Sequence, residues 1–132
     1  MSEVKAGLKY TEEHEWAEPA GGNKVRIGIT DFAQCQLGDI VFVEFPEVGD
    51  VVQAGEPLGT IESVKTVSDL FSPVSGTVTA VNESLLDSPE AVNEQPYVSG
   101  WMVEVEVDGD VSEALKRLWD ADRYKAYIAS EE

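Results

Sequence analysis

The sequence predicts a mainly β fold, a small β-sandwich or flattened barrel with short helices and a helical C-terminus. Turn residues recur through the middle of the chain, from Gly49-Asp50 to Ser75-Gly76, and divide it into short segments. These segments are rich in β-branched residues and too short to form helices. The 132 residues are the length of one domain that can bury a sizeable core. We therefore expect a single domain, residues 1–132, built as a meander of short strands.

The first predicted strand spans residues 24–30, KVRIGIT, where one valine and two isoleucines alternate with Arg, Gly and Thr. This alternation is typical of a half-buried strand. Thr30 or Asp31 can then cap a short helix, because either side chain can accept a hydrogen bond from a free N–H of the first turn. Gly38 suits the left-handed conformation in which such a helix ends.

A second strand is predicted over residues 39–46, DIVFVEFP, which is apolar on both faces and is therefore expected to be more deeply buried. Four further strands are predicted between the turn residues: VVQ at 51–53, LGTIES at 58–63, TVSDLF at 66–71 and GTVTAVN at 76–82. Residues 49–82 are thus expected to form the hairpin core of the fold.

The next elements are a helical turn and a strand. Ser88-Pro89-Glu90 places a capping hydroxyl before a proline, which predicts one helical turn through Val92. Residues 101–107, WMVEVEV, then alternate as a strand does. The alternation points Trp101 and the three valines inward, and Met102 and the two glutamates outward.

The chain is predicted to end in helices, over about residues 111–129. Asp110 with Glu113 forms a capping-box-like pair before ALKRLW, and Asp120 can start a last helix. No low-complexity linker divides the chain, so the sequence offers no place for an additional catalytic domain.

The composition excludes several classes of function. Nine basic residues against 26 acidic ones give a formal net charge of -17, which repels nucleic acid and anionic lipid surfaces but can steer the protein towards basic patches on partner enzymes. The single cysteine, Cys35, and the single histidine, His14, cannot form an internal disulfide or a zinc site by themselves. The sequence shows neither the apolar run of a secretory signal nor a membrane span, so we expect an intracellular protein without membrane or nucleic-acid partners.

Lys65 is the candidate functional residue. It lies between two strand-like runs, and Val64-Lys65-Thr66-Val67 can form a type I turn, which accepts most residue types at its central positions. A hairpin tip holds an amine in solvent on a rigid base, as a modifying enzyme requires. Most exposed lysines are simply solvated, however, and Glu62 and Asp69 flank this one. The lysine alone therefore does not distinguish a modified site from an ordinary surface residue.

The segment around Lys65 and several others resemble the glycine cleavage system H proteins. The resemblance is carried by ESVKTVSDL at 62–70, SPVSG at 72–76, YTEEHEW at 10–16, GITDFAQ at 28–34, LGDIVFVEFPEVG at 37–49 and NEQPYVSGW at 93–101. Together these motifs cover nearly the whole chain. Thr66 in place of a common alanine and Cys35 in place of a polar or acidic residue are departures that leave the acceptor lysine untouched.

The resemblance implies a lipoyl/biotinyl-like β-sandwich that acts as a lipoyl-carrying shuttle and is not itself an enzyme. Lipoic acid would be attached to Lys65 as N6-lipoyllysine by a lipoate ligase or lipoyltransferase. The arm would accept an aminomethyl group from glycine decarboxylase, a pyridoxal phosphate enzyme, and deliver it to an aminomethyltransferase that uses tetrahydrofolate. It would then pass electrons to dihydrolipoamide dehydrogenase, an FAD enzyme. We expect a monomer in the bacterial cytoplasm, or in the mitochondrial matrix if the host is a eukaryote.

The same resemblance implies a surface cleft into which the loaded arm folds. The matching positions are Glu15 and Asp69, whose carboxylates suit the protonated amine of the arm. Glu13 stands where some relatives have a smaller polar residue. His14 is a further candidate for the cleft, but a single histidine beside an aromatic such as Trp16 is more often packed or solvated.

Several other classes of function are alternatives. A stand-alone enzyme needs a base, a nucleophile and an oxyanion or metal site, and no local motif assembles these. Biotinyl domains usually have methionines beside the lysine, where this chain has Val64 and Thr66, and acyltransferase lipoyl domains usually show Asp-Lys-Ala. An H-like protein that relays lipoyl groups to other enzymes, or a non-lipoylated binding module, is a closer alternative. Glu15 and Asp69 favour the glycine-cleaving role, because a relay does not require an amine-binding cleft.

Overall fold

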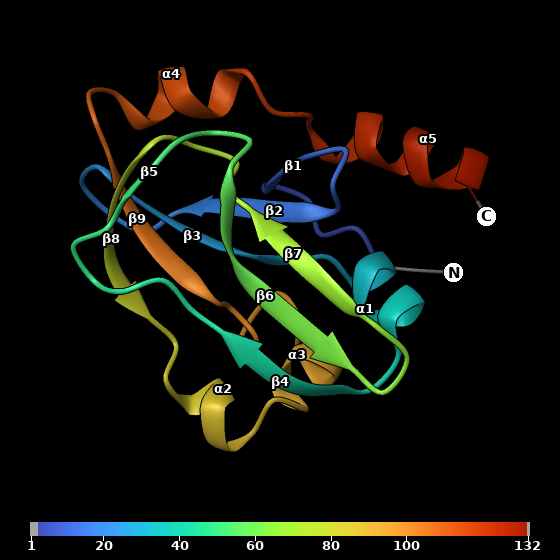
Figure 1. Cartoon of the computed structure of the whole chain (residues 1–132). Coiled ribbons are helices and arrows are strands. Elements are labelled where there is room, and N and C mark those ends of the chain that lie inside the picture. The colour runs from blue at the N-terminus through green and yellow to red at the C-terminus, as the bar shows by residue number, and fades with distance from the viewer. Residues whose placement is uncertain (1–2, 132) are drawn as a thin grey trace.

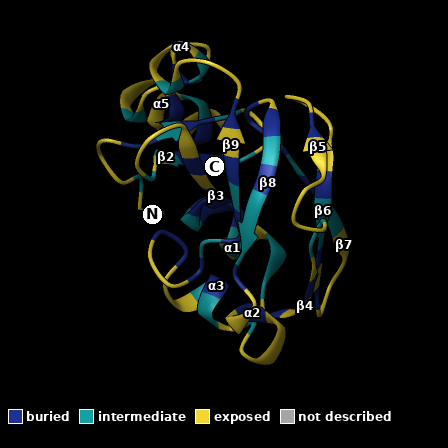
Figure 2. Cartoon of the chain, turned by 90° about the vertical axis from the view of Figure 1, so that its left-hand side faces the viewer, coloured by how far each residue is buried: buried dark blue, intermediate teal, exposed yellow. Residues whose placement is uncertain are grey.

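The computed structural model of the protein describes residues 3–131 and contains two β-sheets packed as layers (Figures 1 and 2). The six-stranded antiparallel sheet has the order β1 (Lys9–Tyr10), β2 (Glu15–Pro19), β3 (Lys24–Ile29), β9 (Val103–Val107), β8 (Gly76–Val81) and β5 (Val51–Val52). The three-stranded antiparallel sheet has the order β4 (Ile40–Glu44), β6 (Pro57–Ser63) and β7 (Val67–Phe71). The helices are α1 (Asp31–Leu37), α2 (Ser84–Asp87), α3 (Ala91–Glu94), α4 (Val111–Lys116) and α5 (Ala121–Glu131). Residues 1, 2 and 132 of the predicted domain lie outside the described residues.

The predicted β-sandwich is confirmed, and within residues 3–131 its two sheets do not close into a barrel. Figure 2 shows the two sheets as separate layers with buried positions on their strands. Val25 and Ile27 of β3 contribute to the core from the larger sheet, and Val43 of β4 and Ile61 of β6 contribute from the smaller one. The alternation predicted for residues 24–30 holds from Lys24 to Ile27, because an antiparallel sheet can bury one face and leave the other in water. It fails beyond Ile27, because Gly28 and Thr30 are buried as well.

Helix α1 forms where the sequence predicts it and leads directly to β4. The Thr30 hydroxyl accepts a hydrogen bond from the Ala33 N–H at 3.2 Å, which confirms Thr30 as the N-cap. Gly38 follows the helix with φ 80° and ψ -157°, which is not the predicted left-handed helical end but is a positive-φ conformation that glycine adopts readily. The chain therefore turns sharply between α1 and β4.

The strand predicted over residues 39–46 is present as β4, but the prediction that it is deeply buried is wrong. β4 lies at the edge of the smaller sheet, and its pairing with β6 shifts register between Ile40 and Phe42. Such a β-bulge disrupts the strict alternation of side chains along a strand. Val41 and Phe42 consequently both face solvent, with exposed fractions of 48% and 45%. An apolar run in the sequence reveals neither a bulge nor an edge position.

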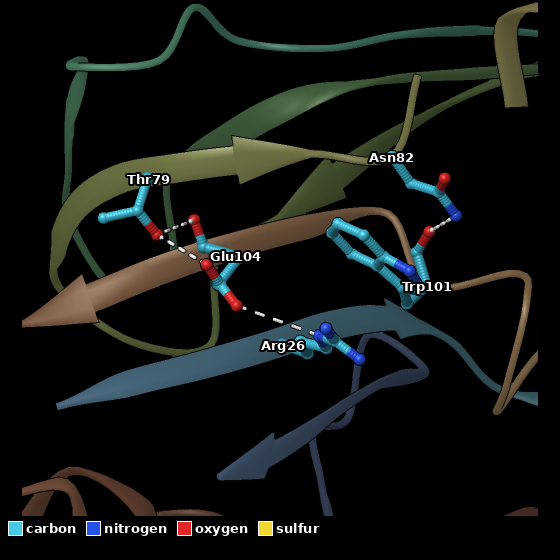
Figure 3. A network of polar contacts seen from close by, with 5 residues as sticks. All are labelled: Arg26, Thr79, Asn82, Trp101 and Glu104. Carbon is cyan, nitrogen blue, oxygen red and sulfur yellow. Dashed lines mark hydrogen bonds and ion pairs between the residues drawn. The ribbon is translucent and has the colours of Figure 1, made fainter. Parts of the chain in front are cut away.

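The alternation predicted for residues 101–107 fails at its start. β9 begins at Val103, so Trp101 and Met102 precede the strand. Met102, predicted to face outward, is fully buried, and its N–H donates to the Ile27 C=O at 2.8 Å. Trp101, predicted to face inward, is only partly buried, and the Arg26 guanidinium lies 4.9 Å from its ring centroid. Figure 3 shows Arg26 near Trp101.

Two short helices, α2 and α3, occupy the region where one helical turn is predicted. Ser88 does not act as the predicted N-cap: it follows α2, and its N–H donates to the Ser84 C=O. Helix α3 begins after Glu90 and buries Val92, in agreement with a helical turn through that residue.

The helical C-terminus is confirmed, and α5 packs against β1, an N-terminal strand that the sequence pattern does not predict. Asp110 caps α4 by accepting a hydrogen bond from the Ser112 N–H. Tyr124 of α5 stacks on Tyr10 of β1, with ring centroids 4.7 Å apart. This contact anchors the segment that leads into β2. No helix within residues 3–131 is long and apolar enough to cross a membrane.

Candidate functional site

Lys65 lies at the exposed tip of the hairpin formed by β6 and β7 (Figure 1). The Ser63 side chain closes this tip: its Oγ accepts hydrogen bonds from the N–H groups of Lys65 at 3.2 Å and Thr66 at 3.1 Å. The Ser63 N–H donates to the Thr66 C=O at 2.8 Å. The peptide groups of the tip are therefore satisfied without glycine or asparagine, because a serine hydroxyl can replace a backbone acceptor in a turn.

The predicted type I turn over residues 64–67 is placed one residue too late. Strand pairing ends with Glu62 opposite Val67, and the next hydrogen-bonded residues are Ser63 and Thr66. The central residues of the turn are therefore Val64 and Lys65. Ser63 is a residue of the site that the sequence pattern did not predict. The available signal was a serine two residues before the lysine, since serine hydroxyls often bind N–H groups shortly after them.

The Lys65 side chain lies at the C-terminal end of α1. Its Nζ donates to the Gln36 C=O at 3.3 Å. Carbonyl groups in the last turn of a helix lack partners within the helix and attract cations. A methyl group at Gly38 would come within 3.1 Å of Lys65 Cε, which is closer than ordinary contact. Gly38 therefore leaves room for the lysine side chain as well as turning the chain.

A cavity of about 130 Å³ lies between α1, the β6–β7 hairpin and the turn before β2. Glu13, His14, Glu15 and Asp69 line it together with apolar side chains, and no lysine or arginine among residues 3–131 does so. Gln36, whose carbonyl accepts from Lys65, also lines it. The structure thus brings all the predicted cleft residues to one cavity beside the lysine.

Glu15 is the most buried of these carboxyl groups, with an exposed fraction of 2%. Its Oε1 accepts from the Thr11 hydroxyl at 2.8 Å, and its Oε2 accepts from the Phe71 N–H at 3.1 Å. Burial raises the pKa of Glu15 to about 8, because desolvation penalises the carboxylate. The two hydrogen bonds oppose this rise, and the nearby charge of Glu13 adds to it. The Glu15 carboxyl is therefore largely protonated at neutral pH.

Asp69 and Glu13 are exposed residues of the same cavity. Asp69 lies on β7 opposite Thr60 of β6, and Glu13 lies in the turn before β2. Glu13 and Glu15 belong to one segment of the chain, and folding brings Asp69 to them from a distant strand. Several carboxyl groups around one cavity suit a cation that can donate hydrogen bonds.

His14 lines the cavity in a strained backbone conformation. Its φ of 67° is the one positive φ of a non-glycine residue within residues 3–131, and such strain persists only where surrounding contacts enforce it. Its Nδ1 lies 2.8 Å from the Tyr124 hydroxyl, which also lies 2.7 Å from the Thr30 hydroxyl. The His14 ring also packs against Phe32, with centroids 4.8 Å apart. These contacts fix the turn that places Glu15.

Residues 8–131 match the protein family described as Glycine cleavage H-protein. The chain belongs to this family. It is 60% identical over 131 residues to the glycine cleavage system H protein of Halalkalibacterium halodurans, covering 99% of this chain and 100% of that one. Its identity to the H protein of Bacillus licheniformis is 59% over 121 residues, or 92% of this chain and 93% of the relative. The crystal structure of a Mycobacterium marinum H protein is similar with a TM-score of 0.82 at 38% identity, covering 96% of this chain and 99% of the other.

The predicted family and carrier function are thereby confirmed. Glycine cleavage H-proteins are the lipoyl-carrying shuttle of the glycine cleavage system, and they are carriers rather than catalysts. Membership in the family implies that the chain works with the other enzymes of that system. The two relatives compared by sequence are bacterial proteins.

Exposed apolar side chains lie close to Lys65 on the H-protein hairpin. Strand register aligns Phe42 of β4, Glu62 of β6 and Val67 of β7 in one row across the smaller sheet. Phe42, Val67 and the tip residue Val64 are all exposed. We use the name tip surface for Phe42, Glu62, Val64 and Val67. Neighbouring exposed apolar side chains are typical of protein contact sites.

Proposed function

We propose that Lys65 carries the lipoyl group as N6-lipoyllysine, attached through an amide by a lipoate ligase or lipoyltransferase. The observation that carries the proposal is the exposed position of Lys65 at a hairpin tip, where an enzyme can reach its amine. The residues around it fit the group, because Ser63 holds the tip and the lysine side chain lies beside an acidic cavity. Gln36 connects Lys65 with the cavity, because its C=O accepts from Lys65 Nζ and the residue lines the cavity.

When bound, the lipoyl group would supply a dithiolane that takes up an aminomethyl group and later transfers electrons. Glu15 and Asp69 would hold the protonated amine of the loaded arm, and His14 would form part of the cavity wall. A cation beside Glu15 favours the ionised carboxylate, so its arrival lowers the pKa of Glu15 and releases the carboxyl proton. Burial strengthens the resulting ion pair, because the effective dielectric constant is lower there than in water.

The proposed partners are glycine decarboxylase with pyridoxal phosphate, an aminomethyltransferase with tetrahydrofolate, and dihydrolipoamide dehydrogenase with FAD. The tip surface supports docking through apolar contacts close to the arm. The net charge of -17 supports electrostatic steering towards basic surfaces on these enzymes. We also propose that residues 1–132 form one carrier domain and that the protein is a monomer. Its proposed location is the bacterial cytoplasm, or the mitochondrial matrix if the host is a eukaryote.

The alternative is an H-like protein that relays lipoyl groups to other enzymes, or a non-lipoylated binding module. A relay requires Lys65 but gains nothing from carboxyl groups in the adjacent cavity. The arrangement of Glu13, Glu15 and Asp69 around that cavity therefore supports the amine-carrying role.

Peptide-mapping mass spectrometry tests the attachment site. The purified chain is incubated with a lipoate ligase, lipoic acid and ATP, with Lys65→Arg and an authentic H protein treated in parallel. A lipoyl amide confined to the peptide containing Lys65, and absent from the variant, supports the proposal. An unmodified Lys65 alongside a modified authentic H protein would reduce the chain to a binding module. Glycine-dependent loading by the decarboxylase then separates the amine carrier from a lipoyl relay.

A further inference from the structure

The side chain of Asn93 in α3 binds both ends of the link between α1 and β4, which consists of Gly38 and Asp39. Its Nδ2 donates to the Gly38 C=O at 2.8 Å, and its Oδ1 accepts from the Ile40 N–H at 2.9 Å. Nδ2 also donates to Gln34 Oε1 at 3.0 Å. The Asn93 amide therefore donates one hydrogen to Gln34 of α1 and one to Gly38, and its oxygen accepts from Ile40.

The link held by Asn93 is attached to the lysine hairpin. The Asp39 C=O accepts a hydrogen bond from the Val64 N–H at 3.0 Å. Val64 immediately precedes Lys65, whose Nζ donates to the Gln36 C=O at the end of α1. The tip is thus connected to the link through its backbone and to the adjoining helix through its lysine side chain.

The Gly38 N–H of this link donates to the Gln34 C=O at 2.9 Å, whereas the Gly38 C=O and the Ile40 N–H are bound by Asn93. Gly38 has φ 80° and ψ -157°, which belong to neither helix nor strand, and glycine loses more conformational freedom on ordering than any other residue. Asn93 can supply the support because α3 is anchored in the core by Val92, which is fully buried. The hydrogen bonds therefore connect the lysine tip to the centre of the molecule.

We propose that Asn93 is a positioning residue that keeps the Lys65 turn in the arrangement that a lipoate ligase and the partner enzymes bind. It acts through Asp39 and Val64 and does not contact the lysine. The inference rests on the proposed function, because ordered display matters if enzymes modify and handle Lys65. When only a fraction of the chains present a competent tip, the apparent affinity of an enzyme for the chain falls by that fraction.

The test compares Asn93→Ala with Asn82→Ala as a matched control. Asn82 likewise donates from Nδ2 to two acceptors, the C=O groups of Ser99 at 2.9 Å and Trp101 at 2.8 Å. Figure 3 shows its amide directed at the Trp101 carbonyl. The hydrogen bonds of this side chain involve neither the α1–β4 link nor the lysine hairpin. The readouts are KM and kcat of a lipoate ligase for the unmodified chain, and hydrogen exchange of the Val64 amide.

We expect Asn93→Ala to raise KM about five-fold with kcat unchanged and to accelerate Val64 exchange by a similar factor, which corresponds to about 1 kcal/mol of lost positioning. Asn82→Ala is expected to lower the melting temperature and to change neither readout. Unchanged KM and Val64 exchange in Asn93→Ala, or equal changes in Asn82→Ala, would overturn the inference.

A second variant keeps the test decisive if Asn93→Ala does not fold. Asn93→Asp retains an acceptor for the Ile40 N–H but cannot donate to the Gly38 C=O or to Gln34 Oε1. Unchanged KM and Val64 exchange in this variant would likewise overturn the inference. The two proposals fail in different ways. A wild-type chain that is not lipoylated on Lys65 contradicts the proposed function, whereas Val64 exchange tests the support from Asn93 without any lipoylation.

Discussion

Replacing Glu15 with glutamine isolates the effect of one buried carboxyl group on stability. The glutamine side chain has nearly the same shape, and its amide can still accept from the Phe71 N–H and donate to the Thr11 hydroxyl oxygen. What changes is the ability to ionise. The wild-type chain must either hold a proton on Glu15 or bury a charge, whereas the variant does neither.

The magnitude follows from the rise of the Glu15 pKa from 4.5 to about 8. Between these values the folded chain keeps a proton that the unfolded chain has released, so the free energy of unfolding falls as the pH rises. The slope is about 1.36 kcal/mol per pH unit, so from about pH 5.5 to about pH 7.5 the wild type loses about 2 to 3 kcal/mol through this group. Glu15→Gln cannot ionise at this position and does not lose this stability. Its free energy of unfolding, relative to that of the wild type, is therefore higher at the higher pH.

Urea denaturation at the two pH values and constant ionic strength measures this difference. The buried Trp16 adjoins Glu15 and makes fluorescence a suitable probe. Glu12→Gln is the matched control, because it removes one exposed carboxylate from the same segment. A stability difference between wild type and Glu15→Gln that is the same at both pH values, or that Glu12→Gln reproduces, would refute the reasoning.

Three further predictions concern the site and its scaffold. Lys65→Arg should abolish lipoylation while changing the free energy of unfolding by less than about 0.5 kcal/mol, because the side chain is exposed; a variant that unfolds would contradict the exposed tip. Asp69→Asn should still be lipoylated but should lose its aminomethyl load about three-fold faster by mass spectrometry, because a charge-assisted hydrogen bond is lost; an equal lifetime removes Asp69 from the cleft. Thr30→Ala should lower the free energy of unfolding by about 1 to 2 kcal/mol in urea, because the Ala33 N–H loses its cap and the Tyr124 hydroxyl loses a partner; a loss near zero would show that the cap contributes little.

Local signals in the sequence predicted the elements that depend on a few neighbouring residues. Thr30 and Asp110 cap helices as expected, because a cap requires only a side-chain oxygen two or three residues before a free N–H. The strands of the middle segment follow from β-branched residues between turn residues. The turn at Lys65 was placed one residue too late because the Ser63 hydroxyl, rather than a backbone carbonyl, closes it.

The sequence by itself determined a β-rich carrier with a lysine between two strands, since periodicity, turn residues and family motifs are all properties of neighbouring positions. Only the tertiary structure decided that Glu15 would be buried, that Phe42 would be exposed and that Asn93 would reach the α1–β4 link. The physical reason is that desolvation and side-chain hydrogen bonding depend on which elements pack together, and those elements are distant in the chain. The predicted cleft residues could be named from motifs, but the protonation state of Glu15 follows from the surroundings that folding creates.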